Sequence, residues 1–324
     1  MFQGLKELTA AKGRTLLITV TVGLIAVLVT FLSALTAGLG HQSVSALKYL
    51  AGDNELILAD SGSTTLSAST LSDQAVAQLE DEGAQMLWQV RDRVADTPTM
   101  LLNSPDLAPG EVSLPAELAD SELADSELAT AHDVVDSSND LYLDHLPVVL
   151  MNTSDLASLA QVRGVTGPAG AFASDVALPS DTVALSGSER WNASASYQGE
   201  QISLNLMIVM LYVISALVLG AFFTVWTIQR LRGIAISSAL GAARRVLIAD
   251  ALGQAIIVLG IGITAGTLIT VISAFGMGDA MPVVISSSTT LFPALILAAA
   301  GLIGSAISLG PILRVEPRSS LMNA

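Results

Sequence analysis

LNLMIVMLYVISALVLGAFFTVWTI, residues 204–228, contains no charged side chain and decides the fold. A helix needs about 20 mostly apolar residues to cross the hydrocarbon core of a bilayer. Three further stretches meet this requirement, at 15–39, 246–275 and 291–310. With its polar start included, the second span covers 201–228. The sequence therefore predicts an integral membrane α-helical protein with four transmembrane helices.

The composition supports this class and excludes several others. Of the 324 residues, 52% are hydrophobic and 13% are charged, which is too apolar for an ordinary soluble domain. The 14 basic and 29 acidic residues give a net charge of −15, so a basic surface for nucleic acid extending over the whole chain is excluded. Because the chain has no cysteine, it forms no disulfide, thiolate metal site or cysteine nucleophile.

Basic residues predict the orientation in the membrane. They gather in the tails, 1–14 and 311–324, and in the segment 229–245, whereas 276–290 has none. The basic residues concerned are Lys6, Lys12, Arg14, Arg230, Arg232, Arg244, Arg245, Arg314 and Arg318. By the positive-inside rule, both tails and the loop 229–245 are expected in the cytoplasm, and 40–200 and 276–290 outside. We therefore expect a multi-pass protein of the cell (plasma) membrane.

The N-terminal segment 1–14 has an amphipathic pattern of its own. Phe2, Leu5 and Leu8 recur every third residue beside charged side chains. This spacing predicts a short elbow helix on the inner leaflet. A cleaved signal peptide is the alternative, although the apolar run of the first span is longer than the roughly 7–15 residues typical of such a peptide.

The segment 40–200 is expected to fold as an extracellular α+β domain inserted between the first two spans. At roughly 160 residues, it is long enough to bury a core of its own. A helical pattern covers Leu71–Val94. Short apolar runs at Glu55–Ala59, Pro147–Met151 and Thr182–Leu185 favour strands.

An acidic repeat interrupts this domain at residues 117–130, ELADSELADSELAT. A period of five matches neither a helix face nor a strand face, so we interpret the repeat as a low-complexity surface insertion. A cation site is the alternative, but the glycine and the ligand spacing of an EF-hand loop are missing.

Small residues four positions apart mark the third and fourth spans. Gly262 and Gly266 form one pair, and Ala300 and Gly304 the other. Such pairs let helix backbones approach closely, either among spans two to four of one chain or across a dimer.

One long outer domain between the first span and three later ones resembles the FtsX/MacB-type permeases of ABC transporters. The stretch RGIAISSALGAARR, 232–245, contains the Ala-Leu-Gly-Ala core that is typical of the family's cytoplasmic loop helix. Gly233 and Ser238 stand where the family usually has an acidic and a basic residue. The tail PILRVEP, 311–317, is similar to the family's closing segment.

Within this family, the chain is most similar to haem exporter permeases of the HrtB type. Gly38-Leu-Gly40 ends the first span, with Phe31 before it, and Ala195–Gln201 leads into LNLMIV, 204–209, and then Ala221-Phe-Phe223. The resemblance covers the order of the spans and both flanks of the outer domain. It implies a homodimer, two copies of a cytoplasmic ABC ATPase subunit, and haem as the transported ligand.

The chain itself is expected not to be an enzyme. It has no GxxxxGK[ST] loop to bind nucleotide phosphates, so ATP hydrolysis is expected on a separate partner chain. No cofactor is expected for catalysis, and no catalytic constellation of Ser, His and Asp is evident.

Haem iron accepts axial ligands from His, Met, Tyr, Cys or a carboxylate. On a helix, Tyr197, Glu200, Met207 and Met210 share one stripe. We expect Glu200 and Met207 to hold the iron, with a supporting set of Tyr197, Asn205, Met210, Phe31 and, as an alternative ligand, His41. Apolar packing is the alternative for the methionines, an interfacial anchor for Glu200 and a solvated surface position for His41. His132 and His145 are assigned to the surface or the fold of the outer domain.

The ATPase contact is predicted in the loop 229–245. A short helix at 234–245 would place its apolar residues in a groove of the ATPase and end in two arginines. These coupling residues are Ile234, Ile236, Leu240, Arg244 and Arg245.

Two other functions remain open at this point. One is an FtsX-like mechanotransmitting permease that regulates an extracellular cell-wall hydrolase. The other is a permease that handles antimicrobial peptides or lipoproteins.

The orientation is testable because the chain has no cysteine of its own. Single cysteines placed at Ser126 and Ser287 should react with a membrane-impermeant maleimide in whole cells, whereas one at Ser238 should not. Labelling at Ser238 in intact cells would reverse the predicted orientation.

Overall fold

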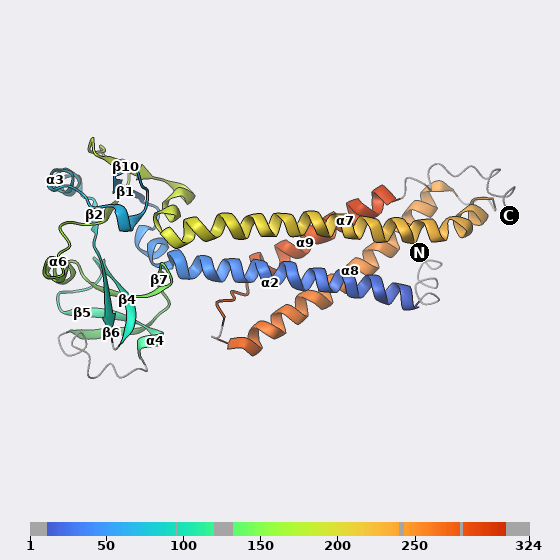
Figure 1. Cartoon of the computed structure of the whole chain (residues 1–324), viewed down its shortest axis with the longest axis horizontal. Helices are drawn as coiled ribbons and strands as arrows, with labels where there is room; N and C mark the ends of the chain where they lie inside the picture. Colours follow the sequence, from blue (N-terminus) through green and yellow to red (C-terminus); the bar gives the residue numbers. More distant parts are fainter. Residues whose placement is uncertain (1–11, 95, 120–131, 240–242, 279–280, 309–324) are drawn as a thin grey trace. The chain divides into compact units, whose positions relative to one another are not determined.

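A computed structural model describes residues 12–94, 96–119, 132–239, 243–278 and 281–308 (Figure 1). The chain divides into two compact units. Met1–Ala37 and Leu204–Ala324 form the first, here called the helical unit, and Gly38–Ser203 forms the second, here called the inserted domain.

Four helices in the described part of the chain are long and apolar enough to cross a membrane. They are α2 (Lys12–Ala51), α7 (Ala195–Ala239), α8 (Arg244–Met277) and α9 (Ser287–Ser308). Each predicted span overlaps one of these helices, so the fold class of a multi-pass helical membrane protein agrees with the sequence.

The helices extend beyond the predicted spans at several ends. Helix α2 continues past Leu39 to Ala51, and α7 begins at Ala195 rather than at 201. Within the predicted connection 229–245, where a short separate helix was expected at 234–245, α7 instead stays helical to Ala239 and α8 begins at Arg244. Residues 229–239 contain no proline and are rich in good helix formers, so nothing ends the helix there. Of the predicted elbow helix 1–14, only 12–14 is described, as the start of α2, and the predicted tail 311–324 lies outside the described residues.

Glycines bring the helices of the helical unit together. A Cβ on Gly262 would lie 2.7 Å from Val22 Cγ1 of α2, and one on Gly266 would overlap the backbone oxygen of Gly23. On α9, a Cβ on Gly304 would lie 3.1 Å from Gly220 Cα of α7. Gly262 and Gly266 of the third span therefore pack against the first span, and Gly304 of the fourth span packs against the second. Packing within the chain was predicted, but among spans two to four, so the contacts with the first span were not expected.

The inserted domain contains two β-sheets. The first is antiparallel in the order β10-β1-β9-β2, from Thr182–Leu185, Glu55–Ala59, Gly170–Ala173 and Gln85–Leu87. The second is mixed in the order β3-β4-β8-β5-β6, from Gln89–Val94, Thr97–Ser104, Leu146–Asn152, Glu111–Pro115 and Asp133–Asn139. Strand β7 (Tyr142–Leu143) pairs with β8 as a hairpin.

Helical segments complete the domain. These are α3 (Asp73–Asp81), α4 (Ala116–Ala119), α6 (Thr153–Val162) and the 3-10 turns η1 (Leu66–Ala68) and η3 (Gly187–Ala193). The three predicted strands are confirmed, the second one inside β8. The predicted helix over Leu71–Val94 is wrong beyond Glu82, because Gly83 takes a φ of +80° and the chain then enters β2 and β3. Most of the acidic repeat, 120–130, lies outside the described residues.

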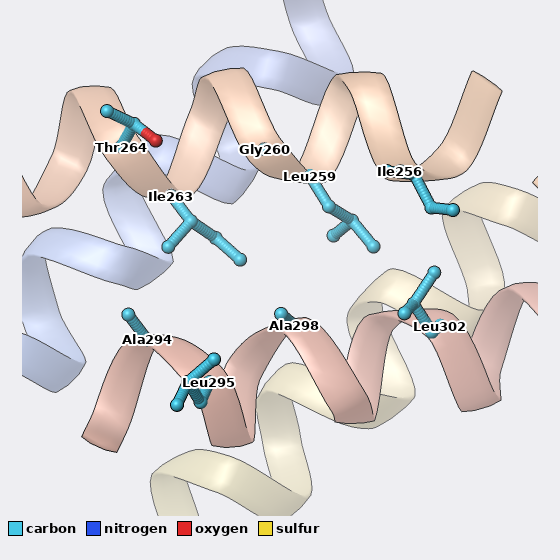
Figure 2. A pocket seen from close by; sticks show the side chains of 9 residues that line it. All are labelled: Ile256, Leu259, Gly260, Ile263, Thr264, Ala294, Leu295, Ala298 and Leu302. Carbon is cyan, nitrogen blue, oxygen red and sulfur yellow. The ribbon is translucent and has the colours of Figure 1, made fainter. Parts of the chain in front are cut away.

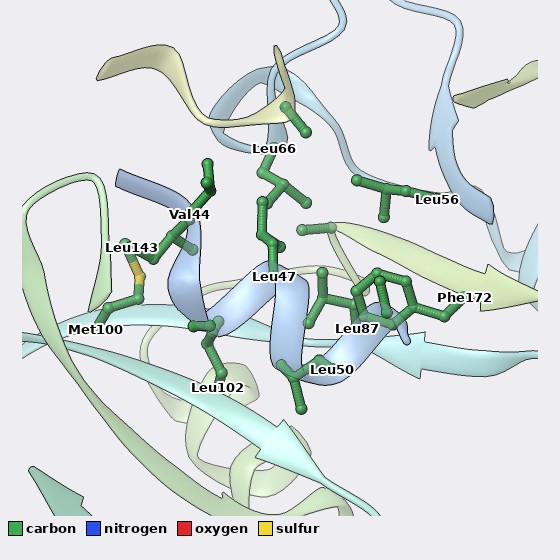
Figure 3. Packing of buried hydrophobic residues seen from close by; sticks show 14 of the residues in the cluster. Val44, Leu47, Leu50, Leu56, Leu66, Leu87, Met100, Leu102, Leu143 and Phe172 are labelled. Atoms are coloured by element: carbon green, nitrogen blue, oxygen red, sulfur yellow. The ribbon is translucent and has the colours of Figure 1, made fainter. Parts of the chain in front are cut away.

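The last turns of α2 form the centre of the domain's core. Val44, Leu47 and Leu50 pack against both sheets, as Figure 3 shows. Phe172 of β9 and Leu102 of β4 lie in the same cluster, and both are buried. The end of the first apolar helix is thus a structural element of the inserted domain.

The glycine contact between α8 and α2 gives a stability prediction. Gly266→Ala should lower the melting temperature in detergent, since its Cβ meets backbone atoms that cannot move aside and overpacking costs about 1–3 kcal/mol. Gly253→Ala on the same helix is the matched control, because nothing lies within 4 Å of its Cβ. The control should hold or raise stability by up to about 1 kcal/mol. Equal effects at the two positions would refute the packing role of Gly266.

Candidate functional site

The candidate site is built around a two-residue turn in the inserted domain. Asp144 and His145 join β7 to β8 with φ angles of +50° and +63°. A two-residue hairpin loop of type I′ requires positive φ at both positions. Asp and His are among the few non-glycine residues that tolerate this conformation, which explains why the turn forms here.

The turn is held against α2 by backbone hydrogen bonds. The Asp144 N–H donates to the Ser43 carbonyl at 3.2 Å, and the His145 N–H donates to the Gln42 carbonyl at 3.0 Å. Beside them, the Tyr142 N–H donates to Ser45 Oγ at 2.7 Å. These contacts fix the position of the hairpin tip on the helix.

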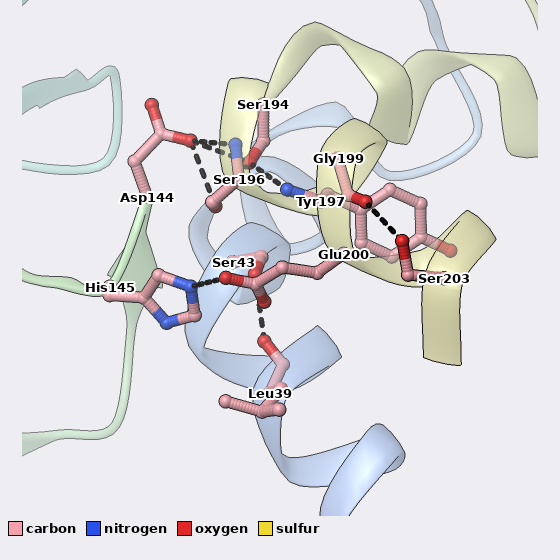
Figure 4. Close-up of polar contacts among 10 residues, drawn as sticks. All are labelled: Leu39, Ser43, Asp144, His145, Ser194, Ser196, Tyr197, Gly199, Glu200 and Ser203. Atoms are coloured by element: carbon pink, nitrogen blue, oxygen red, sulfur yellow. Dashed lines mark hydrogen bonds and ion pairs between the residues drawn. The ribbon is translucent and has the colours of Figure 1, made fainter. Parts of the chain in front are cut away.

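The Asp144 carboxylate binds the first residues of α7 (Figure 4). Its Oδ1 accepts hydrogen bonds from Ser194 Oγ at 2.7 Å, Ser196 N at 3.1 Å and Ser196 Oγ at 3.0 Å. Ser194 Oγ in turn accepts from the Tyr197 N–H at 3.2 Å, the pattern of an N-cap. A carboxylate at a helix N-terminus also interacts favourably with the positive end of the helix dipole. Asp144 therefore determines where α7 begins.

His145 contacts Glu200, one of the predicted haem ligands (Figure 4). The distance from His145 Nε2 to Glu200 Oε1 is 2.9 Å, and about a third of each side chain is exposed. Glu200 Oε2 is buried and accepts no hydrogen bond from the described residues. A buried polar oxygen without a partner costs free energy, so this position of the Glu200 side chain is not a fully stabilised one.

Other predicted residues of the inserted domain lie nearby. Gly40 lets α2 approach α7, since a Cβ there would lie 3.0 Å from Gln201 Nε2 and 3.8 Å from Tyr197 Cε2. Tyr197 also packs on the domain's core. His41 has a different partner from Glu200, because its Nε2 lies 3.0 Å from Asp140 Oδ2. The two sequence flanks that carry the resemblance therefore meet in space.

The remaining predicted haem residues belong to the helical unit. Met207 and Met210 on α7 are 57% and 54% exposed, so neither packs in the core of the single chain. Asn205 is exposed as well, and Phe31 of α2 is partly buried. Their combination with Glu200 into one site stays a prediction.

Sequence reasoning missed the contact made by His145. It assigned this residue only to the surface or fold of the domain. The pattern YLDHLP, 142–147, with two polar residues between apolar ones, could have predicted a hairpin tip. No local signal could have linked it to Glu200, 55 positions further along.

The predicted coupling residues are only partly described. The backbone at Ile234 and Ile236 belongs to α7, and Arg245 is exposed at the start of α8. The side chains of these isoleucines and of Arg244, and the whole of Leu240, lie outside the described residues.

An apolar pocket of about 230 Å³ lies between α8 and α9 (Figure 2). Thr264 carries the only polar side chain among its lining residues: Ile256, Leu259, Gly260, Ile263, Thr264, Ala294, Leu295, Ala298 and Leu302. The pocket suits hydrocarbon and offers no strong ligand for iron. In the part of the chain that the structure describes, no group of three His, Asp or Glu side chains could hold a bare metal ion, but haem iron needs only one or two axial ligands.

Comparison with known proteins agrees with the motifs. No protein-family model matches the chain. A protein of Staphylococcus haemolyticus strain JCSC1435 is 29% identical over 96% of both chains. Proteins of Staphylococcus epidermidis strains RP62A and ATCC 12228 are each 24% identical over the same shares. All three carry the provisional name hemin transport system permease protein HrtB. Along nearly its whole length, the chain is thus similar in sequence to proteins named as HrtB permeases, the resemblance that its flanking motifs indicated.

Proposed function

We propose that this chain is the membrane subunit of an ATP-driven ABC efflux pump that removes haem from the membrane and so protects the cell from it. The observation that carries the proposal is Glu200, a partly buried carboxylate with an unpartnered oxygen at the start of α7. It lies in the segment with the closest resemblance to haem exporter permeases. The named relatives support the same ligand.

Haem presents a large apolar plate, two propionates and an iron that takes axial ligands. In the proposed site, which lies in a cleft between the second spans of two copies of the chain near the outer leaflet, Glu200 and Met207 hold the iron, and Tyr197, Asn205 and Met210 line the cleft. Phe31 covers a porphyrin face. Exposed methionines suit this task, because their flexible, polarizable side chains adapt to a flat apolar ligand.

The assembly that fits this function is a homodimer with two ATPase subunits on the cytoplasmic side. Helix α7 runs without a break from Ala195 to Ala239, a length of roughly 65 Å at 1.5 Å per residue. One helix therefore carries both Glu200 and the segment proposed to contact the ATPase. ATP-driven closure at one end would move the other end and expel the ligand.

A second candidate is an FtsX-like mechanotransmitting permease. The observation that favours it is that α2 extends from the helical unit into the core of the inserted domain. Such a helix could transmit motion to an extracellular hydrolase. Saturable haem binding distinguishes the two functions, because a mechanotransmitter has no need for it.

Glu200→Ala and Met207→Ala test the proposed ligands. Each should change the Soret and charge-transfer bands of the haem complex and weaken binding, since the iron loses an axial ligand. Loss should be partial for each single variant and larger for the pair, because burial of the porphyrin plate retains part of the affinity. Absorbance titration of the purified chain with haemin measures both effects.

The controls are Glu189→Ala and Met281→Ala, which change exposed residues of the same types elsewhere in the chain. Both should bind haem as the unaltered chain does. If the Glu200 and Met207 variants keep normal spectra while His41→Ala abolishes binding, the iron ligand lies at the end of the first span instead.

The coupling segment is tested by reversing the charge of Arg244 and Arg245 together. The double variant should bind haem normally but lose haem resistance in cells, because ATP hydrolysis no longer reaches the transport helices. Arg93→Glu on the inserted domain is the control and should leave resistance intact. Full resistance in the double variant would show that this segment does not couple the ATPase.

A further inference from the structure

The Glu200 carboxylate is not free to bind a ligand in this structure. Glu200 Oε1 lies 2.9 Å from His145 Nε2, within hydrogen-bond distance, and Glu200 Oε2 is buried. Iron coordination needs a carboxylate oxygen with an open approach. The side chain must therefore leave this position before it can act as an axial ligand.

His145 cannot easily follow Glu200 when it moves. Its backbone N–H is bound to the Gln42 carbonyl, and the preceding Asp144 is bound to Ser43 and to the start of α7. The positive φ of +63° at His145 restricts the turn further. An outward movement of Glu200 thus breaks the contact between the two side chains.

We infer that His145 is an affinity-determining residue, an internal competitor for the carboxylate that the proposed function assigns to haem iron. In the arrangement described here, His145 holds the Glu200 side chain through the 2.9 Å contact between His145 Nε2 and Glu200 Oε1. Haem binds when the iron replaces His145 as the partner of the carboxylate. This inference rests on the proposed role of Glu200 and adds the group against which haem must compete.

The contact between His145 and Glu200 is suited to reversible binding of haem, because only one of the two carboxylate oxygens has a hydrogen-bond partner. One oxygen has a hydrogen bond, whereas the buried Oε2 has none among the described residues. A buried acceptor without a partner destabilises the arrangement in which His145 contacts Glu200. The His145 contact therefore lowers the affinity for haem without preventing its binding, which suits a pump that must also release its cargo.

The test is a haemin titration of the full-length chain carrying His145→Asn. Asparagine tolerates positive φ, so the turn is kept, but its side chain is too short to reach Glu200. The dissociation constant should fall about threefold to tenfold, the value of one hydrogen bond of roughly 0.7–1.4 kcal/mol. The Soret maximum should stay in place, since the iron ligands are unchanged.

Two variants separate this competition from a structural effect. His145→Gln keeps an N–H donor near the position of Nε2 and should return the affinity toward that of the unaltered chain. Arg163→Gln breaks the 2.6 Å ion pair with Asp92 on the same domain and should change nothing. In a Glu200→Ala background, His145→Asn should have no further effect.

The other possible haem affinities of these variants would each contradict one part of the inference. Weaker binding in His145→Asn would mean that His145 supports Glu200 as a ligand, and unchanged binding would mean that the contact has no role. Tighter binding that persists in the Glu200→Ala background would show that His145 acts elsewhere. If Glu200→Ala alone binds haem normally, the proposed iron ligand is wrong, and the inference falls with it.

Discussion

The site depends on the hydrogen bonds of the two-residue turn Asp144–His145. Its backbone N–H groups donate to carbonyls of α2, and its aspartate accepts one hydrogen bond from Ser194, just before α7, and two from Ser196 in the first turn of α7. Because the residues at Ser194 and Ser43 are buried, their polar groups need these partners. A single turn therefore sets the positions of the two helices within the inserted domain, and with them the position of Glu200.

This arrangement gives α2 and α7 two tasks each. Both carry an apolar segment of the kind that crosses a membrane, and both take part in the inserted domain. Within the helical unit, glycines at the contacts with α8 and α9 let the helices approach closely. Long continuous helices with close contacts favour movement of whole helices over local bending, a property that suits the proposed coupling of an ATPase to a ligand site.

The sequence predicted the parts of the fold that follow from periodicity and charge. Twenty or more apolar residues can hardly form anything but a spanning helix, and short apolar runs such as Glu55–Ala59 gave strands with correct bounds. Helix ends were less predictable, because α2 beyond Leu39 owes its burial to sheets formed by distant residues. The same holds for β2 and β3, which look helical in isolation but pair with β9 and β4.

The candidate site was predictable only in part. Glu200 stood out because an ionisable residue at the start of an apolar helix is unusual. Its partner did not, because His145 is brought to it by a hairpin and a turn conformation that no local pattern reveals. The stretch 229–239 was predicted only in part, as a separate short helix from 234, because Arg230 and Arg232 interrupt the apolar pattern when only hydropathy is considered.

The central claim is that this chain binds haem specifically. Its most direct test is an absorbance titration of the purified, unaltered chain with haemin in detergent or nanodiscs. The account predicts a saturable shift of the Soret band that ends near one haem per two chains. A linear, non-saturating change like that of haemin added to empty detergent or nanodiscs would contradict it.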